Sequence, residues 1–590
     1  MRNLSKKLML IVALCCTVLY FGCKEDEKEV AVTSVSVSPT SITLTEGGTQ
    51  SATVTVLPKE ANQRVIWSSD RASVATVDGE GLITAIAPGI TTVTATSESD
   101  PTQKASLIVT VNAAVYPVES VRVEPTSVRI EMDATATIVA TVLPELANQT
   151  VTWYSENTSV ASVKNGVITG VWAGTTNITV ISEADATKTA SVEVTVTTPS
   201  REKADRNCIT DDTETYFFAS EEIIRQRFDM LKAIGTNVLR CEVSWRDLEL
   251  GEGAWYMNSH IFSYLTIAKE YGFRIKLIIG VMMSPPPWYL DKYPESRLRD
   301  EDGRTSENTM SLWYPGLKAL ITEKSTQLIN ILKDKGLWDN VDYIIPSYGP
   351  AGEPLYPPLW TLAPDFPGHT FWGYDVNAQK SFNTWAQNKY TSLSAANAAW
   401  NTAFATWNDV VVLKPGIQPG KYWEDMLTWY RDSKREYIAW QTQQTLDLVK
   451  GENKKIVIYV PGTEYTDANW AAAVSSAGGN DNIKIMADSR FLIDLAEEKG
   501  CMLQYTGMPA ETEVKRLRAY MDAKNYKVEM WGENAGDAVS AGNPDLLARI
   551  IVQNRLFGLD YTKSNYLFKE GTLEPTELME KLKIAFKKIN

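Results

Sequence analysis

Two acidic residues stand in short stretches whose composition is unsuited to regular structure. Glu353 is the only charged residue of YGPAGEPLYPP, at 348–358, beside two glycines and four prolines. Glu533 lies in WGENAG, at 531–536. Each stretch follows an apolar segment with the pattern of a short strand, VDYII in one case and YKVEM in the other. Because glycine permits a sharp turn and proline stiffens it, each carboxylate is predicted to be fixed at a strand end.

Two fixed carboxylates from different strands are the arrangement that glycoside hydrolysis needs. One carboxylic acid protonates the leaving oxygen, so its pKa must be raised by burial or by a neighbouring charge. The other stays ionised, either to attack the anomeric carbon or to activate water. Three further acids fall near expected strand ends and compete for these roles, namely Glu242, Glu464 and Glu529.

The elements that must position these acids alternate between helix and strand. From residue 220 onward, amphipathic stretches such as SEEIIRQRFDMLKAIG precede short apolar runs such as TNVLRCEVSW. Over about 380 residues this alternation predicts a parallel sheet covered by helices. The number of units favours a TIM barrel, (β/α)8, over residues 208–590, and no glycine-rich dinucleotide fingerprint supports a doubly wound alternative.

In a TIM barrel, functional side chains lie where strands end and loops begin. Arg240 and Glu242 follow this rule on TNVLRCEVSW, which is expected to be the first strand. Aromatic residues of the loops could stack on sugar rings, although packing in the core is the alternative for each; they are Trp288, Trp313, Tyr356, Trp360, Trp372 and Trp531. The expected substrate-binding set is Arg240, Glu242, Trp288, Tyr356, Trp531 and Asn534.

Three segments of this region resemble the family 42 β-galactosidases. GTNVLRCEVSWRDLELGEGAW, at 235–255, is similar to the first βα unit of that family, and SPPPWYLDKYPE, at 284–295, to its second loop. FNTWAQNKYTSLSAANAAWNTAFATWNDV, at 382–410, resembles the segment after its fourth strand. The resemblance implies a β-galactosidase-like glycoside hydrolase in which Arg240 orients or charges the site.

The sequence departs from that family directly before Glu353. Family 42 and its clan place asparagine before the acid/base glutamate, whereas Gly352 stands here. GPAGE instead resembles the catalytic motif of the family 14 β-amylases, as do MLTWYRD at 426–432 and GENA at 532–535. The second catalytic glutamate of those amylases would align with Pro509, two residues before Glu511.

The pair of an inverting amylase is therefore not expected, and Glu533 remains as the second carboxylate. It stands at the end of the expected seventh strand, where the family 42 clan keeps its nucleophile. The resemblance thus implies a retaining glycosidase with Glu353 as acid/base and Glu533 as nucleophile. The alternatives are an inactive surface protein that binds glycan, an inverting β-amylase-like enzyme, and an adhesin.

The overall composition narrows the possible partners. A net charge of −14 over 590 residues disfavours nucleic acid, because phosphate binding needs a basic surface. Only two histidines occur, and the six cysteines form no CxxC pattern. Neither a metal site nor a cofactor is expected, and the predicted partner is a polysaccharide or oligosaccharide substrate.

The amino terminus has the pattern of a targeting signal. Basic residues precede an apolar run of about 14 residues that ends at Gly22-Cys23, too short for a bilayer span. The pattern resembles a bacterial lipoprotein signal, which implies cleavage after residue 22 and lipidation of Cys23. The acidic segment 23–30 resembles a surface-export tether. An outer-membrane lipoprotein exposed at the cell surface is therefore expected, with an ordinary cleaved signal as the alternative.

Between this signal and the expected barrel, the chain contains a repeat. SVSVSPTS and SVRVEPTS begin 86 positions apart, and the offset also aligns Trp67 with Trp153. Alternating β-branched and polar residues predict two β-sandwiches, at 31–112 and 117–197, each burying its own tryptophan. Both resemble bacterial immunoglobulin-like domains of group 2, which implies a spacer role.

Overall fold

The structure is a computed structural model. It describes residues 29–199, 207–210, 220–349, 352–356, 371–416, 419–461, 467–475, 489–507, 511–534, 544–561, 567–569 and 572–589. The predicted signal and Cys23 lie outside these residues.

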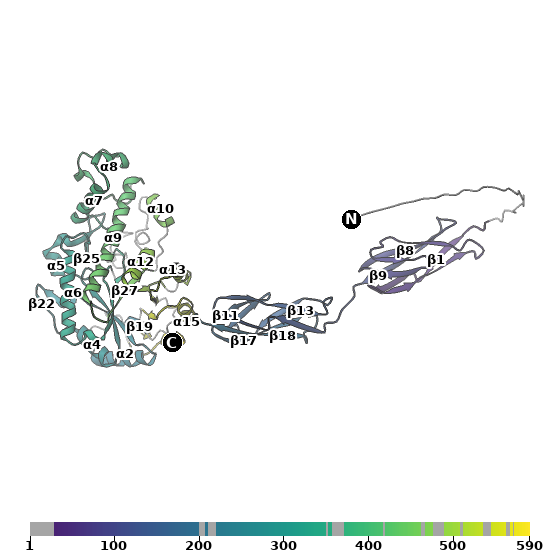
Figure 1. Cartoon of the computed structure of the whole chain (residues 1–590), viewed down its shortest axis with the longest axis horizontal. Coiled ribbons are helices and arrows are strands. Elements are labelled where there is room, and N and C mark those ends of the chain that lie inside the picture. The colour runs from purple at the N-terminus through teal and green to yellow at the C-terminus, as the bar shows by residue number, and fades with distance from the viewer. Residues whose placement is uncertain are drawn as a thin grey trace, which may run out of the picture. The chain divides into compact units, whose positions relative to one another are not determined.

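The two repeats form two all-β domains with the same topology (Figure 1). In the first, a four-stranded sheet in the order β2-β9-β8-β5 is accompanied by the pair β1-β4 and the sheet β3-β7-β6. Its strands are β1 Ser34–Ser38, β2 Ser41–Thr45, β3 Thr49–Ser51, β4 Thr53–Leu57, β5 Val65–Ser69, β6 Ala75–Val77, β7 Leu82–Ala85, β8 Gly89–Ser97 and β9 Lys104–Asn112. Val93, Ala95, Val109 and Ile83 are fully buried in its core, whereas Trp67 is only half-buried against it.

The second domain repeats each of these sheets 85 or 86 residues later. Its strands are β10 Ser120–Glu124, β11 Ser127–Glu131, β12 Thr135–Thr137, β13 Val139–Leu143, β14 Val151–Ser155, β15 Ala161–Lys164, β16 Val167–Gly170, β17 Gly174–Ser182 and β18 Thr189–Thr197. The period-2 alternation of the sequence places every second side chain of β17 and β18 in the core. The predicted pair of immunoglobulin-like sandwiches is thus confirmed, although Trp153 is half-buried rather than buried.

The C-terminal part of the chain is a closed parallel barrel, which confirms the predicted TIM fold. Its strands, in order around the barrel, are β19 Asn207–Thr210, β20 Val238–Ser244, β23 Arg274–Gly280, β26 Val341–Ile345, β27 Lys455–Val460, β28 Met502–Tyr505, β29 Met530–Asn534 and β30 Leu559–Tyr561. Each strand is parallel to its neighbours, and β19 closes the barrel by pairing with both β20 and β30.

One strand of the barrel differs from the sequence prediction. TNVLRCEVSW forms β20, which is the second strand rather than the first. The first strand, β19, is the four-residue run NCIT, which begins one residue before the predicted barrel bounds of 208–590. So short a run carries no recognisable period, and its role appears only when its neighbours are paired on both sides.

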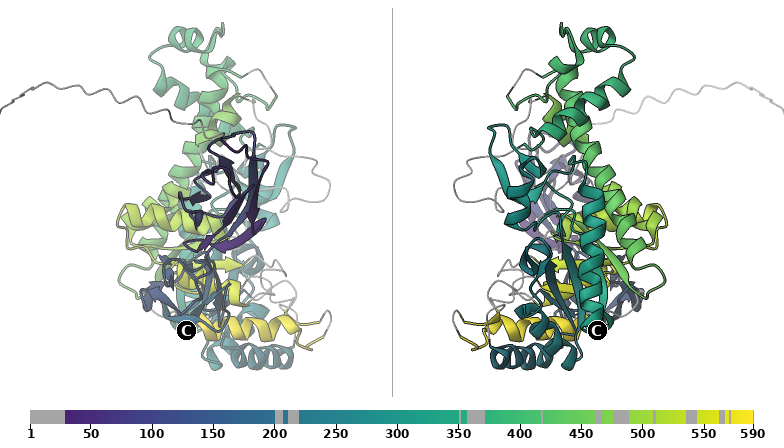
Figure 2. Two further views of the ribbon diagram at one scale, coloured as in Figure 1. Left: turned by 90° about the vertical axis from the view of Figure 1, so that its right-hand side faces the viewer. Right: turned by 90° about the vertical axis from the view of Figure 1, so that its left-hand side faces the viewer.

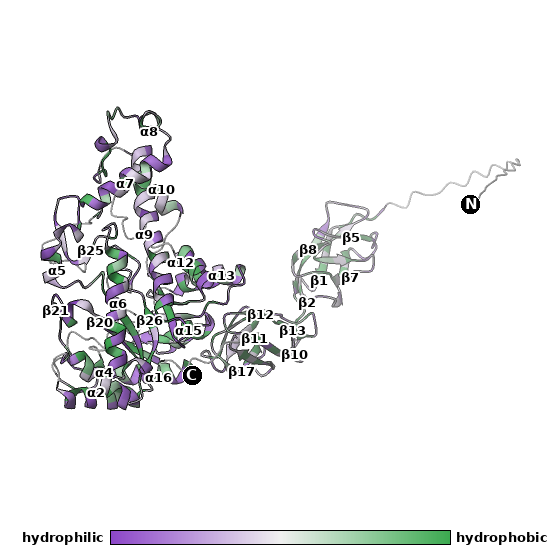
Figure 3. Ribbon diagram, turned by 60° about the vertical axis from the view of Figure 1, so that its left-hand side comes forward, coloured by the Kyte–Doolittle hydropathy of each residue, from purple (hydrophilic) through white to green (hydrophobic). Residues whose placement is uncertain are grey.

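Helices cover the outside of the barrel between successive strands (Figures 1 and 2). They are α2 Glu221–Ala233, α4 His260–Glu270, α6 Leu317–Asp334, α9 Lys421–Leu448, α12 Ser489–Lys499, α13 Glu511–Ala523, α15 Pro544–Gln553 and α16 Glu577–Ile589. Apolar residues concentrate on the strands and on the helix sides that face them, while polar residues lie on the outer sides of the helices (Figure 3). This pattern buries the sheet on both faces, as a parallel barrel requires.

A long excursion separates β26 from β27. Helices α7 Val376–Lys389 and α8 Leu393–Trp400 pack against α9, which extends beyond the barrel (Figures 1 and 2). An aromatic cluster fills this excursion, with Trp372, Trp423 and Tyr430 fully buried. Much of the high tryptophan content therefore belongs to a hydrophobic core.

Candidate active site

Three predicted site residues meet at the carboxyl end of the barrel strands. Arg240 projects from β20, Glu533 from β29, and Glu353 from the segment after β26. The Arg240 Nη1 atom lies 3.8 Å from Glu533 Oε1 and donates to the Tyr459 hydroxyl at 2.7 Å. Catalytic residues of TIM barrels lie at this end, so the arrangement is a candidate active site.

Glu533 is buried inside the mouth of the barrel, with 6% of its surface exposed. Burial raises the pKa of its carboxyl to about 7, and the charge of Asp560 acts in the same direction. Arg240 and the amide of Gln504, which donates to Glu533 Oε2, oppose this rise in pKa. Glu533 is thus a carboxyl group held by a cation and an amide in a site that excludes solvent.

Glu353 is bound on the other side of the site. The Thr506 hydroxyl donates to Glu353 Oε1 at 2.8 Å, and the same threonine also approaches the carbonyl oxygen of Val460. Burial raises the pKa of Glu353, while Thr506 and the charge of Arg240 act against the rise. The charge of Glu353 also raises the pKa of Glu533, by less than burial and the charge of Asp560 do.

The two glycines before Glu353 are required by the path of the chain. A Cβ atom on Gly349 would lie 2.3 Å from the carbonyl oxygens of both Glu353 and Leu355. Gly352 has φ of +82°, and a Cβ atom there would lie 2.9 Å from Ile345 Cγ2. The backbone folds back on itself at this point, and the fold directs the Glu353 side chain into the site. At Gly352, the position where the resemblance to family 42 implies asparagine, the structure leaves no room for a side chain.

Gly352→Ala is expected to destabilise the protein by about 1–3 kcal/mol, through the positive φ and the contact with Ile345. Activity should fall further, because the shift of the chain displaces Glu353. Chemical denaturation and kcat/KM would measure the two effects. Gly451→Ala is the matched control, since Gly451 has φ of +85° and nothing within 4 Å of the added Cβ atom. Equal losses in both variants would show that the packing against Ile345 is unimportant.

Glu242 provides a third carboxylate near this end of the barrel. It lies on β20, where it accepts a hydrogen bond from the Ser284 hydroxyl at 3.1 Å. Burial raises its pKa, and the bond from Ser284 acts against the rise. A Cβ atom on Gly280 would lie 2.2 Å from Glu242 Oε1, so glycine at 280 makes room for this carboxylate.

Two of the predicted sugar-stacking aromatics are corrected by their burial. Trp531 is fully buried inside the barrel, below Glu533, where its ring packs against Tyr343 and Phe557. Tyr356 is 3% exposed and stacks on Tyr430 at a centroid distance of 4.1 Å. Neither ring has the free face that stacking on a sugar requires.

The remaining aromatics differ in exposure. Trp288, on α5 Pro287–Lys292, is half-buried, and its indole N–H donates to the carbonyl oxygen of Glu249. Trp313 is half-buried and stacks on Trp429, whereas Trp372 is fully buried. Trp360 lies outside the described residues.

Glu529 and Glu511 lie away from this site. Glu529 precedes β29, so it lies toward the amino-terminal end of the barrel, away from Glu533. Glu511 begins α13 and forms ion pairs with Arg549 and Lys515. Glu464, Pro509 and the side chain of Asn534 are outside the described part of the chain.

Sequence reasoning missed five polar residues around the two glutamates: Tyr459, Gln504, Thr506, Lys276 and Asp560. Their signal was a polar residue at an inward position of an apolar strand, as in RIKLIIG and MLQY. Lys276 pairs in register with Arg240, and Asp560 with Glu533, so all four side chains point into the barrel.

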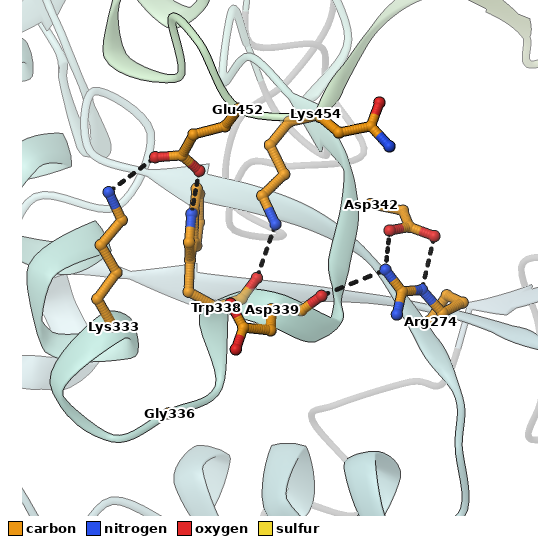
Figure 4. Close-up of a pocket in the computed structure, with 9 residues that line it drawn as sticks. Arg274, Lys333, Gly336, Trp338, Asp339, Asp342, Glu452 and Lys454 are labelled. Atoms are coloured by element: carbon orange, nitrogen blue, oxygen red, sulfur yellow. Dashed lines mark hydrogen bonds and ion pairs between the residues drawn. The ribbon is translucent and has the colours of Figure 1, made fainter.

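A separate pocket of about 520 Å³ lies at the amino-terminal end of the strands (Figure 4). Most of its charged side chains are paired within it: Arg274 pairs with Asp342, Lys333 pairs with Glu452, and Lys454 donates to backbone carbonyls. The position and the internal pairing distinguish it from the candidate active site.

Over the described residues, no group of three His, Cys, Asp or Glu side chains is arranged to hold a metal, and no helix is both long and apolar enough to cross a membrane.

Comparison with known families agrees with both parts of the fold. Residues 31–109 and 117–194 each match the bacterial Ig-like domain of group 2. Residues 216–492 match the glycoside hydrolase family 42 domain, described as beta-galactosidase. This match includes β20, β23, β26 and β27, and therefore Arg240 and Glu353, but it ends before Glu533.

Proteins with similar sequences include beta-amylases and a beta-galactosidase. A thermophilic beta-amylase of Thermoanaerobacterium thermosulfurigenes is 29% identical over 26% of this chain and 29% of its own length. Beta-galactosidase BbgII of Bifidobacterium bifidum is 24% identical over 31% of this chain and 24% of its own length. The chain thus spans less than a third of either relative.

A solved structure supports the fold of the barrel region. The catalytic domain of a beta-amylase from Paenibacillus polymyxa superposes with a TM-score of 0.53 and 19% identity, over 65% of this chain and 97% of that domain. The chain thus contains two segments that match group 2 bacterial Ig-like domains and a barrel whose residues 216–492 match the glycoside hydrolase family 42 model, and the solved structure agrees with the barrel fold.

Proposed function

We propose that the protein is a retaining glycosidase that cleaves O-glycosidic bonds of an oligosaccharide or polysaccharide. Glu353 acts as acid/base and Glu533 as nucleophile. The observation that carries the proposal is the convergence of both carboxylates on Arg240 at the carboxyl end of the barrel, where the charge of Arg240 lowers the pKa of each. Two carboxylates and one cation, supplied by three different strand units, fit the requirements of glycoside hydrolysis.

The reaction would proceed in two steps. Glu533 attacks the anomeric carbon while Glu353 gives its proton to the leaving oxygen, which produces a covalent glycosyl-enzyme. Glu353, now a carboxylate, takes a proton from water, and the resulting attack by water releases Glu533. Arg240 stabilises the carboxylate of Glu533 before and after the covalent stage. Because the pKa of Glu533 is about 7, the acidic limb of kcat/KM is expected near neutral pH.

The proposed substrate is a β-galactoside or a related β-glycoside, supported by the family 42 match. Glu242 supplies a hydrogen-bond acceptor for a sugar hydroxyl, and Trp288 is the remaining aromatic candidate of the predicted binding set. A second candidate is an inverting enzyme that acts on α-glucan, favoured by GPAGE and by the similarity to beta-amylases. The stereochemistry of the first product distinguishes the two mechanisms.

We further propose that the enzyme works outside the cell as an outer-membrane lipoprotein anchored through Cys23. The support is the sequence of residues 1–30, and the two immunoglobulin-like domains provide length between anchor and barrel. Metabolic labelling with a radioactive fatty acid, in wild type and in Cys23→Ala, tests the anchor. Unlabelled wild-type protein would exclude it.

The deciding experiment is sugar release from a panel of β-galactans, other plant and algal polysaccharides, and starch, with Glu353→Gln in parallel. Release that the variant lacks would establish the hydrolase and its substrate class. Proton NMR of the first product would then report retention or inversion. Binding without release in both proteins would instead support the inactive glycan-binding alternative.

Glu533→Gln is expected to stabilise the protein at neutral and alkaline pH. Folding raises the pKa of Glu533 from 4.5 to about 7, so the folded state binds more protons than the unfolded state between these values. The stability of the wild type therefore falls as pH rises from about 4.5 to 7. The free energy of unfolding gained by the variant should grow over this range, by up to about 3 kcal/mol.

Urea denaturation at pH 4.5 and pH 8 would measure this gain. Glu511→Gln is the control, because Glu511 lies on an outer helix and pairs with Lys515 and Arg549. A gain for Glu533→Gln that does not change with pH would contradict the burial of an ionisable Glu533 carboxyl.

A further inference from the structure

Beneath Glu533 the barrel encloses three polar side chains that the two-carboxylate mechanism does not use. Lys276 on β23, Gln504 on β28 and Asp560 on β30 are each 0% exposed. The Lys276 ammonium donates to Gln504 Oε1 at 2.5 Å and to Asp560 Oδ2 at 3.1 Å. Buried charges and amides are costly, so a complete network at this position indicates a role beyond filling space.

The network fixes which way the Gln504 amide faces. An ammonium group can only donate, so the amide oxygen of Gln504 must point to Lys276. The amide nitrogen is then directed to the opposite side, where it donates to Glu533 Oε2 and, at 3.1 Å, to Asp560 Oδ2. A reversed amide would place its N–H groups against the ammonium and leave both carboxylates without this donor.

The network also balances the charge next to Glu533. Asp560 is in register with Glu533 on the neighbouring strand, and its charge raises the pKa of Glu533. Lys276 forms an ion pair with Asp560 and lies 3.7 Å from the centre of the Trp531 ring. The network therefore offsets a repulsive charge and supplies a donor at the same time.

Other titratable groups face this cluster from the remaining elements. Arg240 and Tyr459 lie on one side of Glu533, and Glu353 lies across the site. The thiol of Cys208, on β19, forms a hydrogen bond with Asp560 from the far side. Lys276 forms an ion pair with Asp560 at 3.1 Å, and the charge of Arg240 also acts on Asp560.

We propose that Lys276, Gln504 and Asp560 form a positioning unit, in which Lys276 orients the Gln504 amide so that its N–H holds the Glu533 carboxylate in place for reaction. The inference rests on the proposed catalytic role of Glu533. These three residues act through Glu533 and do not themselves contact the substrate.

The test uses two substitutions whose effects have opposite signs. Lys276→Met removes the ammonium that pairs with Asp560 and frees the amide, so the pKa of Glu533 should rise, and the acidic limb of kcat/KM should move to higher pH by about one unit or more. Asp560→Asn removes the repulsive charge and leaves the cation, so the limb should move to lower pH. A purely structural role predicts loss of stability in both variants without opposite shifts. Shifts in the same direction, or none, would overturn the proposal.

A readout independent of activity separates this inference from the proposed function. The infrared band of the protonated Glu533 carboxyl, assigned by its loss in Glu533→Gln, can be titrated in the whole protein. The midpoint should rise in Lys276→Met and fall in Asp560→Asn, even if no substrate is found. If Lys276→Met fails to fold, Gln504→Met takes its place. This variant removes the amide N–H that donates to Glu533, so the midpoint should also rise. An unchanged midpoint in Gln504→Met would contradict the inference.

Discussion

Glu353→Gln is expected to reduce kcat/KM for the natural glycoside by about 10²–10⁴-fold while the fold is retained. Gln has nearly the shape of Glu and can still accept the hydrogen bond from Thr506, but it carries no acidic proton for the leaving oxygen. The loss should shrink for an aryl glycoside with an acidic phenol as leaving group, because that oxygen leaves without protonation. Steady-state kinetics on both substrates, with circular dichroism of the variant, would check this.

Glu511→Gln is the matched control for this experiment, because Glu511 is the acid nearest to the position that an inverting amylase would use. It lies at the start of α13 with its charge paired by Arg549 and Lys515, so near-normal kcat/KM is expected. Loss of activity in Glu511→Gln, with little effect in Glu353→Gln, would reject the assignment of the acid/base residue.

Glu533→Gly should lower kcat by about 10⁴-fold or more, because the covalent step loses its nucleophile. Azide can enter the space left by the side chain and attack the anomeric carbon of an activated aryl glycoside. Release of the phenol should then recover, and the product should be a glycosyl azide of inverted configuration. In Glu353→Ala, azide should instead act on the glycosyl-enzyme and give the retained configuration. NMR of the two azide products distinguishes the roles directly.

Glu529→Gly is the control for the azide experiment, because Glu529 directly precedes β29, the strand that carries Glu533. Glu529 precedes β29 and lies away from the carboxyl end where Arg240 and Glu353 meet. Azide should therefore have no effect on this variant. Rescue at Glu529 rather than Glu533 would move the nucleophile, and absence of rescue at both would favour the inverting alternative.

Local sequence patterns specified the kinds of domain and the two principal acids. Alternation of period two, repeated at an offset of 86, is a local signal, and it specified both immunoglobulin-like sandwiches. Alternating amphipathic and apolar stretches specified the barrel, because each helix and strand carries its own burial pattern. Glu353 was visible for the same reason, since glycine and proline mark a constrained turn wherever it lies.

Closure of the barrel determines which polar residues share the site, and long-range packing determines which aromatics belong to the core. Lys276, Gln504 and Asp560 are separated by up to 284 positions and meet because the barrel closes. Strand β19 is recognisable only through its two neighbours. Trp531 and Tyr356 looked like loop aromatics, but Trp531 faces the barrel interior and Tyr356 stacks on Tyr430 of α9. Burial depends on contacts between distant segments, and spacing along one segment carries no record of those contacts.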